Sequence, residues 1–343
     1  MNSSPLRAFT RSSPLIFSAT RRREVLMANT AALSDAALFT KPPSFMNVPR
    51  TLDLSSAKAA ILGVPFDCGT HAFRIGSRQG PTSIREQSQL VRWFESEVAD
   101  YDVRERLGLV DCGDVALVPS RITEAFEKIE EAAWRIISAG ATLVGFGGDG
   151  SISVPLVRAA ARRWPDLALV HIDSHTDCHP VNEDHPYDAA SQFTHTALEQ
   201  RISPMASYHV GVRGPTFRKG VLDHTRSLGY NIISMRDYMR RGEADVLAEL
   251  HEVLRGRPVY LSWDMDSFDP SVAPGVCTPT WGGFTAREGL SLLRGLAGLE
   301  IVAVDINTVS PPHDVHGMAA HLAAYIAYET LLLFPERPSE HGC

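Results

Sequence analysis

The sequence has few cysteines, no long apolar segment and no excess of basic residues. Its five cysteines form no C-x-x-C pair and are odd in number, which favours a reducing, cytoplasmic setting over a disulfide-bonded secreted domain. No apolar run approaches the roughly 20 residues that span a bilayer, so we expect no membrane contact. The formal net charge is −7, and no face rich in Lys or Arg follows the amino terminus. Nucleic acid is therefore not an expected partner.

The amino-terminal part differs in composition from the rest of the chain. Residues 1–23 contain five arginines, several serines and no acidic residue. That composition resembles a targeting peptide, and the alternative is a natural start at Met27. We expect residues 1–45 to form a disordered or targeting-like extension. Residues 46–343 are predicted to form one domain, because 44% apolar and 21% charged residues are ordinary for a globular chain.

Apolar, strand-like runs alternate with helix-like segments from residue 59 onward. Strands are expected at residues 59–64, 141–146, 167–170, 208–212, 231–234, 257–263 and 300–305. Helices are expected at residues 81–92, 122–138, 154–164, 243–254, 287–296 and 317–334. This alternation predicts an α/β fold with three layers, α/β/α, in which helices cover both faces of a parallel sheet.

The stretch VHIDSHTDCH, residues 170–179, follows one of these apolar runs. Side chains on a strand alternate between faces, so every second residue is expected to project the same way. The residues in question are His171, Asp173, His175, Asp177 and His179. Carboxylates and imidazoles together suit a first-row divalent metal such as Mn, Ni, Zn or Fe. The alternative is a solvated polar turn, but like charges this close repel unless a cation neutralises them.

A second acidic cluster follows the strand expected at residues 257–263. Asp264 and Asp266 share a face, and Asp269 comes shortly after them. A D-x-D pair alone is weak evidence, because Asp also makes turns. Two such clusters at strand ends indicate a dinuclear centre, in which a carboxylate bridges ions ~3.5–4 Å apart. In open parallel sheets ligands bind outside the carboxyl ends of the strands, so both clusters are expected to meet there.

Seven spaced motifs resemble those of the ureohydrolases. They cover about residues 55–335 and read GVPFDCGT (63–70), GPTSIR (80–85), GDV (113–115), GGDGS (147–151), DSHTD (173–177), SWDMDSFDP (262–270) and DINTVSP (305–311). The family includes arginases, agmatinases, guanidinobutyrases and the nickel-dependent guanidine and metformin hydrolases. The chain looks nearest to this last branch. The resemblance implies the family's α/β/α fold and its assembly as trimers or hexamers.

The resemblance also implies roles for the residues of both clusters. Asp173 and Asp264 would bridge two metal ions, His175 and Asp266 would complete one of them, and Asp177 would belong to the other. A hydroxide shared by the two ions would attack the guanidinium carbon, and Asp266 would receive a proton in transit.

Three further residues take their expected roles from the same resemblance. His195, in FTHTAL, aligns with the family's proton-shuttle histidine. Thr308 and Asp305, in DINTVSP, are placed beside the substrate.

The sequence departs from the family pattern at three positions. The family loop GGDHS carries a metal-binding histidine where this chain has Gly150, so we expect one bound Ni or Mn ion, or none, where the family binds two. Thr308 replaces the glutamate that grips the guanidinium in arginases, which leaves room for a smaller or alkylated guanidine. Thr196 replaces the glycine after the shuttle histidine. Four residues are candidates to replace the histidine that is missing at position 150: His71, His171, Cys178 and His179.

Two functions follow from these departures. In the first, the chain is a ligand-depleted subunit that supports an intact paralogue in a hetero-oligomer hydrolysing guanidine, metformin or a related alkylguanidine to urea or an amine. In the alternative, it is a self-sufficient dinuclear agmatinase-like or guanidine hydrolase. A histone-deacetylase-like amidohydrolase fits less well, because DSHTD with SWDMD matches the ureohydrolase pattern.

Overall fold

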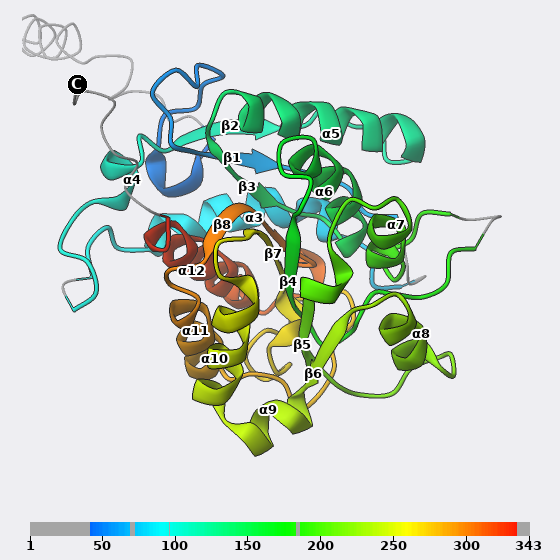
Figure 1. The fold of residues 1–343 in the computed structure, drawn as a ribbon. Helices are drawn as coiled ribbons and strands as arrows, with labels where there is room; N and C mark the ends of the chain where they lie inside the picture. The colour runs from blue at the N-terminus through cyan, green and yellow to red at the C-terminus, as the bar shows by residue number, and fades with distance from the viewer. Residues whose placement is uncertain (1–41, 69–72, 96, 183–185, 335–343) are drawn as a thin grey trace, which may run out of the picture. The chain divides into compact units, whose positions relative to one another are not determined.

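The strands form one eight-stranded sheet in which all neighbours run parallel (Figure 1). This computed structural model describes residues 42–68, 73–95, 97–182 and 186–334. Across the sheet the strand order is β2-β1-β3-β8-β7-β4-β5-β6. The strands are β1 (Ala59–Gly63), β2 (Val110–Asp114), β3 (Thr142–Phe146), β4 (Ala168–Ile172), β5 (Tyr208–Val212), β6 (Asn231–Ser234), β7 (Pro258–Asp264) and β8 (Glu300–Asn307).

Helices cover both faces of this sheet, which confirms the predicted three-layer α/β/α fold (Figure 1). The longer ones are α5 (Ile122–Ser138), α6 (Ser153–Ala161), α10 (Glu243–Leu254), α11 (Ala286–Gly295) and α12 (Met318–Leu332). The shorter ones are α3 (Gly80–Gln87), α4 (Val103–Arg106), α7 (Gln192–Leu198), α8 (Val221–Ser227) and α9 (Met235–Arg241). One core contains side chains of α5, α6 and α7, and the other contains side chains of α3 and of α9 to α12.

Alternation along the strands divides the apolar side chains between these two cores. On β1, Ala59 and Ile61 face one core, whereas Ala60 and Leu62 face the other. Both sets are buried, because a parallel sheet covered on each face has no solvent side. The strands therefore read as continuous apolar runs, which is why most of them could be recognised in the sequence.

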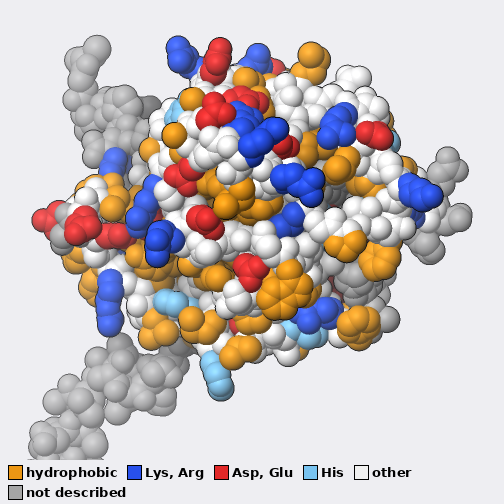
Figure 2. Space-filling view, turned by 90° about the horizontal axis from the view of Figure 1, so that it is seen from below, with side chains coloured by type: hydrophobic (Ala, Val, Ile, Leu, Met, Phe, Trp, Pro, Cys, Tyr) orange, Lys and Arg blue, Asp and Glu red, His pale blue; other side chains and the backbone are white. Residues whose placement is uncertain are grey.

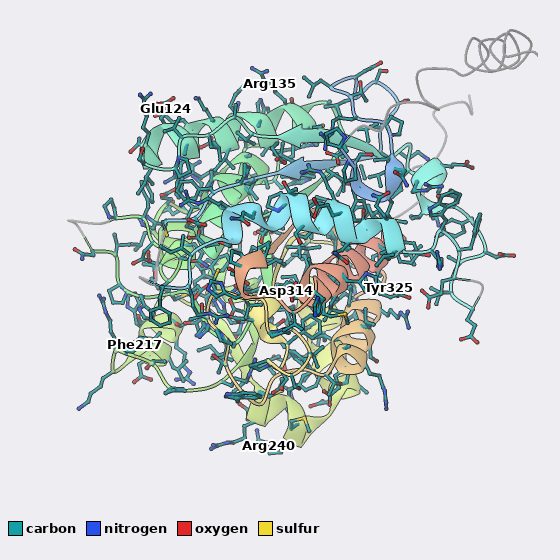
Figure 3. The ribbon with its side chains drawn as sticks, turned by 180° about the vertical axis from the view of Figure 1, so that it is seen from behind. Glu124, Arg135, Phe217, Arg240, Asp314 and Tyr325 are labelled. Carbon is teal, nitrogen blue, oxygen red and sulfur yellow. The ribbon has the colours of Figure 1, made fainter. Side chains whose placement is uncertain are left out.

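Helix α12 is apolar on nearly all sides and packs against α3 and α11. Asp314, labelled in Figure 3, lies before its first turn. Its carboxylate accepts hydrogen bonds from the backbone N–H groups of Ala319 (3.0 Å) and Ala320 (3.1 Å). An acidic side chain in this place satisfies amides that have no partner within the helix, and it complements the helix dipole.

Several short elements were not expected from the sequence. Edge strand β2 was missed because Asp111, Gly113 and Asp114 interrupt its apolar pattern. Helices α4, α7, α8 and α9 each have four to seven residues, too few for a visible helical period. Helix α3 ends at Gln87, before the expected Arg92.

The expected amino-terminal extension lies almost entirely outside the described residues, which begin at Pro42. Phe45, its last expected residue, is fully buried, and its ring packs edge-on against Phe146 with centroids 5.1 Å apart. Packed structure therefore starts by Phe45. Among the described residues no helix is long and apolar enough to cross a membrane. Charged side chains of both signs are interspersed on the face in Figure 2.

The strand order fixes where a ligand site is expected. Strands β3 and β4 are consecutive in the sequence, but β8 and β7 lie between them in the sheet. The connections after β3 and β4 therefore diverge and leave a crevice beyond the carboxyl ends of the central strands. The loops after β3, β4, β7 and β8 all border this crevice.

Candidate metal centre and pocket

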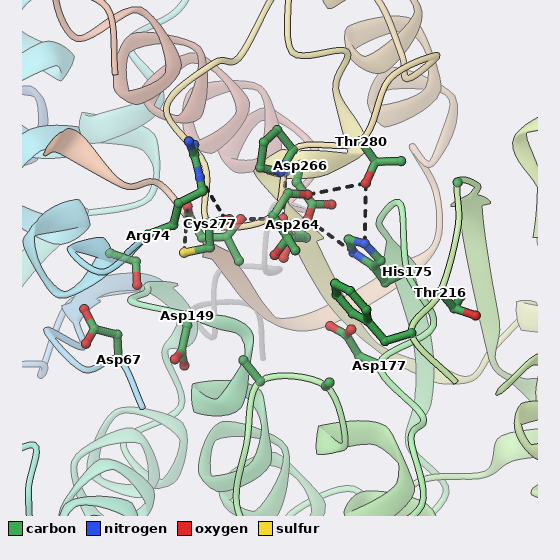
Figure 4. A pocket seen from close by; sticks show the side chains of 18 of the residues that line it. Asp67, Arg74, Asp149, His175, Asp177, Thr216, Asp264, Asp266, Cys277 and Thr280 are labelled. Atoms are coloured by element: carbon green, nitrogen blue, oxygen red, sulfur yellow. Dashed lines mark hydrogen bonds and ion pairs between the residues drawn. The ribbon is translucent and has the colours of Figure 1, made fainter. Parts of the chain in front are cut away.

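The acidic residues predicted from the two motifs come together at the ends of β4 and β7 (Figure 4). The Nδ1 atom of His175 lies 3.3 Å from Asp173 Oδ1 and 3.3 Å from Asp266 Oδ2. These three residues form one group that could hold a metal ion. Asp177 and Asp264 line the same pocket as His175 and Asp266. All five residues predicted as metal ligands are thus neighbours.

The expected alternation of side chains from His171 to His179 was partly wrong. Strand β4 ends at Ile172, so the residues beyond it do not alternate as on a strand. The chain turns instead, and Asp177 adopts a φ of +50°, a conformation uncommon for residues other than glycine. His171 lies within the strand and is buried, whereas His179 lines the pocket.

Backbone amides and side chains hold the carboxylates in place. Asp173 Oδ1 accepts a hydrogen bond from the N–H of His175 (2.6 Å), and Asp264 Oδ1 accepts one from the N–H of Asp266 (2.7 Å). The hydroxyl of Ser174 donates to Asp266 Oδ1 (2.7 Å). Each D-x-H or D-x-D motif therefore folds into a short loop in which the first carboxylate fixes the second residue.

Burial and mutual repulsion disturb the protonation of this cluster. Burial, with the charge of Asp266 second, raises the pKa of Asp173 to about 7. Burial also raises the pKa values of Asp177 and Asp264 well above the usual range, and neighbouring carboxylates add to the effect. Removing water makes several negative charges in one place unfavourable unless a cation joins them.

The pKa values of Asp266 and His175 shift in the directions that keep both groups charged. Burial acts to raise the pKa of Asp266, but the charge of His175 and several hydrogen bonds outweigh it and lower that pKa. Burial acts to lower the pKa of His175, but Asp266 and Asp173 outweigh it and raise that pKa well above its usual value. In this arrangement the imidazolium of His175 neutralises part of the cluster.

The donor atoms of the cluster fit a divalent metal. Asp173 Oδ2 and Asp266 Oδ2 are both buried and each lies beside an imidazole nitrogen, that of His175 being 3.3 Å from Asp266 Oδ2. Asp173 Oδ2 is 2.8 Å from His171 Nε2, and His171, Asp173 and Asp177 form a second group that could hold an ion. Several buried carboxylates close together are unfavourable without compensating charge, and a cation would supply it here. Oxygen with imidazole nitrogen is a donor set for Mn, Ni, Zn or Fe.

The space beside Gly150, where the family resemblance lacks a histidine, is filled by a side chain from α7. A Cβ atom on Gly150 would lie 2.5 Å from Nε2 of Gln192 and 3.4 Å from Oδ2 of Asp177. Gln192 donates a hydrogen bond from Nε2 to Asp177 Oδ2. The position that carries no ligand is thus packed by a carboxamide.

A cavity of about 530 Å³ opens above the cluster. In Figure 4, His175, Asp264 and Asp266 lie on one side of it, and Asp67 and Asp149 lie on the other. Asp149 is buried, which raises its pKa, and it accepts a hydrogen bond from the N–H of Cys68 (2.7 Å). The volume suits a small molecule.

Aromatic side chains form the outer part of the cavity wall. Phe73, Phe217 and Trp281 line it and are 81%, 96% and 75% exposed. Their faces give the mouth an apolar character, in contrast to the carboxylates at its base. The cavity therefore combines a site for positive charge with a surface for apolar groups.

The three other predicted site residues have different surroundings. Thr308 lines the cavity with a φ of +64°, and its hydroxyl donates to Asp264. Asp305 is fully buried within β8 outside the cavity lining, and its carboxylate accepts hydrogen bonds from Tyr260 OH (2.6 Å) and Ser262 Oγ (3.0 Å). His195 also lies outside the lining, and its Nε2 contacts the carbonyl oxygen of Pro186. The roles of His195 and Asp305 stay predictions.

Sequence reasoning missed three residues that shape the site. Arg213, after β5, donates from its guanidinium to the backbone oxygens of Asp266 (2.8 Å) and Phe268 (3.1 Å) and so supports that loop. Asp149 was visible only as part of the motif GGDGS. Gln192 had no signal, because nothing around it in the sequence resembles a ligand motif.

Comparisons with known proteins agree with this geometry. The model of the arginase family matches residues 57–333. The chain is 35% identical over 302 residues to an agmatinase of Sodalis glossinidius, covering 87% of this chain and 95% of that protein.

Two solved structures of similar proteins superpose closely on this chain. Proclavaminate amidino hydrolase from Streptomyces clavuligerus superposes with a TM-score of 0.82 at 32% identity, over 86% of this chain and 97% of that one. A hypothetical agmatinase from Burkholderia thailandensis superposes with a TM-score of 0.78 at 30% identity, over 86% of this chain and 91% of that one.

Proposed function

Because this chain belongs to the arginase family of hydrolases acting on linear amidines, we propose that it works in the hydrolysis of a guanidine-type C–N bond. The products would be urea and an amine, or urea and ammonia. The observation that carries the proposal is the gathering of Asp173, His175, Asp177, Asp264 and Asp266 at the base of one small cavity. Buried carboxylates beneath an opening of this size suit a compact cationic substrate.

The same residues would hold Mn or Ni. Asp173, His175, Asp177, Asp264 and Asp266 would supply the ligands of this centre. When bound, the metal supplies Lewis-acid chemistry that makes water a nucleophile near neutral pH. The convergence of the buried carboxylates of Asp173 and Asp266 with His175 supports this assignment.

The side chains themselves have two tasks. The carboxylates attract and orient a guanidinium group, and this attraction is strong because the carboxylates are buried and poorly screened. Asp266, whose pKa is lowered, remains ionised at neutral pH and is fixed by Ser174. Its Oδ2 lies 3.3 Å from Nδ1 of His175 and would accept a proton during the reaction.

The substrate we favour is guanidine or a small N-alkylated guanidine such as metformin. Thr308 offers a hydroxyl where arginases have a glutamate, and that hydroxyl is already engaged with Asp264. The exposed rings of Phe217 and Trp281 suit alkyl groups or a cationic face better than a second charged end.

We also propose that the chain acts in a cytoplasmic hetero-oligomer, a trimer or hexamer, beside a paralogue with an intact metal site. Two features support this: Gly150 brings no ligand, and His195 lies outside the cavity lining. The alternative, a self-sufficient enzyme, is favoured by Gln192, which occupies the space next to Gly150.

One measurement separates these possibilities. Release of urea, ammonia and dimethylamine from guanidine and metformin is followed for the chain alone and for the chain with an intact paralogue, each with added Mn or Ni. The subunit proposal expects little turnover by the chain alone and substantial turnover by the mixture. An ordinary enzymatic rate by the chain alone, about 1–10³ per second, would make it a self-sufficient enzyme. No hydrolysis in any mixture would contradict the guanidine proposal itself.

A further inference from the structure

Gln192, the first residue of α7, is buried and lies against the loop after β3. The distances from a Cβ atom built on Gly150 are 2.5 Å to Nε2 and 3.5 Å to Cδ of Gln192. A side chain at position 150 would therefore run into this carboxamide. The glutamine occupies the place through which such a side chain would enter the site.

The two polar atoms of this carboxamide are unequally satisfied. Nε2 donates to Asp177 Oδ2 at 2.5 Å, so the group reaches a carboxylate of the cluster. Oε1 is buried and has no hydrogen-bond partner among the described residues. A buried carbonyl oxygen without a partner is unfavourable, and it is a suitable ligand for a hard cation.

We infer that Gln192 supplies, through Oε1, the metal ligand that Gly150 lacks, and that the ion next to Asp177 has an all-oxygen site. The inference rests on the proposed function, since it assigns a ligand to that function's metal centre. The two terminal atoms of a carboxamide are similar in size, so a half-turn about the last side-chain bond exchanges them without extra space. Oε1 then takes the place beside Asp177 that Nε2 holds, and a cation between the two oxygens removes their repulsion.

This assignment makes the two metal positions chemically different. One has the imidazole of His175, which suits Ni, Zn or Mn. The other has only carboxylate oxygens and an amide oxygen, a donor set that suits Mn better than Ni or Zn. A neutral amide is a weaker ligand than imidazole for these ions. The second ion is therefore held less tightly and is selective for Mn.

Other candidates for the missing ligand are less suitable. His171 belongs to the group with Asp173 and Asp177, but both of its ring nitrogens are already engaged: Nε2 lies 2.8 Å from Asp173 Oδ2 and Nδ1 lies 2.9 Å from Nδ1 of His209. Cys178 Sγ lies 3.5 Å from Nε2 of His209. Of these side chains, Gln192 is the one that lies against both Gly150 and Asp177.

The test is a calorimetric titration of the full chain with MnCl₂ and, separately, with NiCl₂. We expect two Mn ions per chain with unequal affinities and one tightly bound Ni ion. Gln192→Leu, which keeps a branched side chain one atom shorter but removes the carboxamide, should weaken the second Mn at least about tenfold and leave the first unchanged. Gln192→Glu, which keeps an oxygen there, should retain both Mn ions.

A second pair of variants checks the geometry. In Gly150→His with Gln192→Ala, the introduced imidazole has room, and the second site should gain Ni affinity. Gly150→His alone has to displace Gln192 and should gain less.

The outcomes separate this inference from the proposed function, because metal binding is read without substrate. If Gln192→Leu binds the second Mn as well as or more tightly than the unmodified chain, Gln192 fills space and is no ligand. A single Mn per unmodified chain overturns the inference too. Two Mn ions that depend on Gln192, with no urea release in any mixture, would uphold the inference and reject the proposed function.

Discussion

His171 and His209 face each other across neighbouring strands, with their Nδ1 atoms 2.9 Å apart. Burial lowers the pKa of His171 to about 4, and burial together with His171 lowers that of His209 well below its usual value. Both rings are therefore neutral at pH 7, and one Nδ1–H donates to the other. The pair lies directly beneath Asp173, since His171 Nε2 is 2.8 Å from that carboxylate.

The first prediction concerns acid stability and His209→Gln, which keeps a polar group beside His171. The unfolded chain binds a proton on histidine below a pH of about 6.5, whereas buried His209 does not. Its contribution to stability is therefore present above that pH and is lost as the pH falls. We expect the variant to lose less unfolding free energy between about pH 7 and pH 5 than the unmodified chain.

Urea unfolding at several pH values measures this difference. Asp173, with its pKa raised to about 7, acts in the opposite direction, because the folded state binds its proton first. That contribution is present in both proteins and cancels in the comparison. Parallel curves for the two proteins would contradict the prediction.

The second prediction concerns Thr308, whose hydroxyl donates to Asp264. This hydrogen bond favours the ionised carboxylate, so removing it should make protons compete better with the metal. Thr308→Ala is expected to weaken Mn binding about 10–100-fold at neutral pH. Thr308→Ser keeps the hydroxyl and should bind Mn nearly as the unmodified chain does. Equal affinities for the Ala and Ser variants, measured by calorimetry, would show that the hydroxyl is not involved.

The third prediction concerns Arg85, a buried cation that joins α3 to β2. Its guanidinium donates to Asp111 Oδ2 (2.7 Å) and to Asp114 Oδ1 (2.5 Å). Arg85→Met removes the only buried cation beside Asp111 among the described residues and leaves the half-exposed Arg50 at 4.0 Å, so it should cost about 3–5 kcal/mol. Arg135, labelled on α5 in Figure 3, is a matched control, because Arg135→Met at an exposed position should change stability by about 0.5 kcal/mol or less. Urea unfolding of both variants gives the comparison.

Local patterns were enough to predict the layers of the fold and the acidic cluster. Asp173 directly follows buried strand β4 and Asp264 is the last residue of β7, and parallel strands bring such ends together. Strand β2 could not be predicted in the same way, because its buried Asp111 is stabilised by an ion pair with Arg85 of α3. A contact between distant elements leaves no local pattern.

The contents of the site beyond that cluster also depend on distant contacts. Gln192 meets Gly150 across 42 positions, and His209 meets His171 through the register of β4 and β5. No periodicity specifies either pairing. Asp305, by contrast, stood in a recognisable motif, yet its hydrogen bonds are made with Tyr260 and Ser262 inside the sheet.

The fourth prediction concerns the amino terminus. A chain that starts at Met27 should melt within a degree or two of the full chain and keep its oligomeric state. A chain that starts at Val48 should melt several degrees lower, because it lacks buried Phe45 and Met46. It also loses the hydrogen bond from the Phe45 N–H to Asp111 (3.0 Å). Thermal unfolding followed by circular dichroism compares the three chains, and a large loss for the Met27 start would contradict this boundary.

The last prediction concerns the aromatic mouth of the cavity. Trp281 lines it and is 75% exposed, so truncation removes a contact surface with little effect on folding. A cation or alkyl group over an exposed ring gains ~0.5–1 kcal/mol, which corresponds to a few-fold change in affinity. Trp281→Ala should therefore raise KM for metformin about two- to fivefold, with kcat nearly constant, because this contact is the same in the ground state and the transition state.

Guanidine gives the internal comparison for this variant. It is too small to reach from the carboxylates to the exposed ring, so its KM should change little. Met205→Ala is the matched protein control, since Met205 is 84% exposed and lies outside the cavity lining. Initial rates are measured on whichever form turns over, the single chain or its complex with a paralogue. An equal rise in KM for both substrates, or a fall in kcat alone, would mean that Trp281 acts through the structure of the loop and does not contact the substrate.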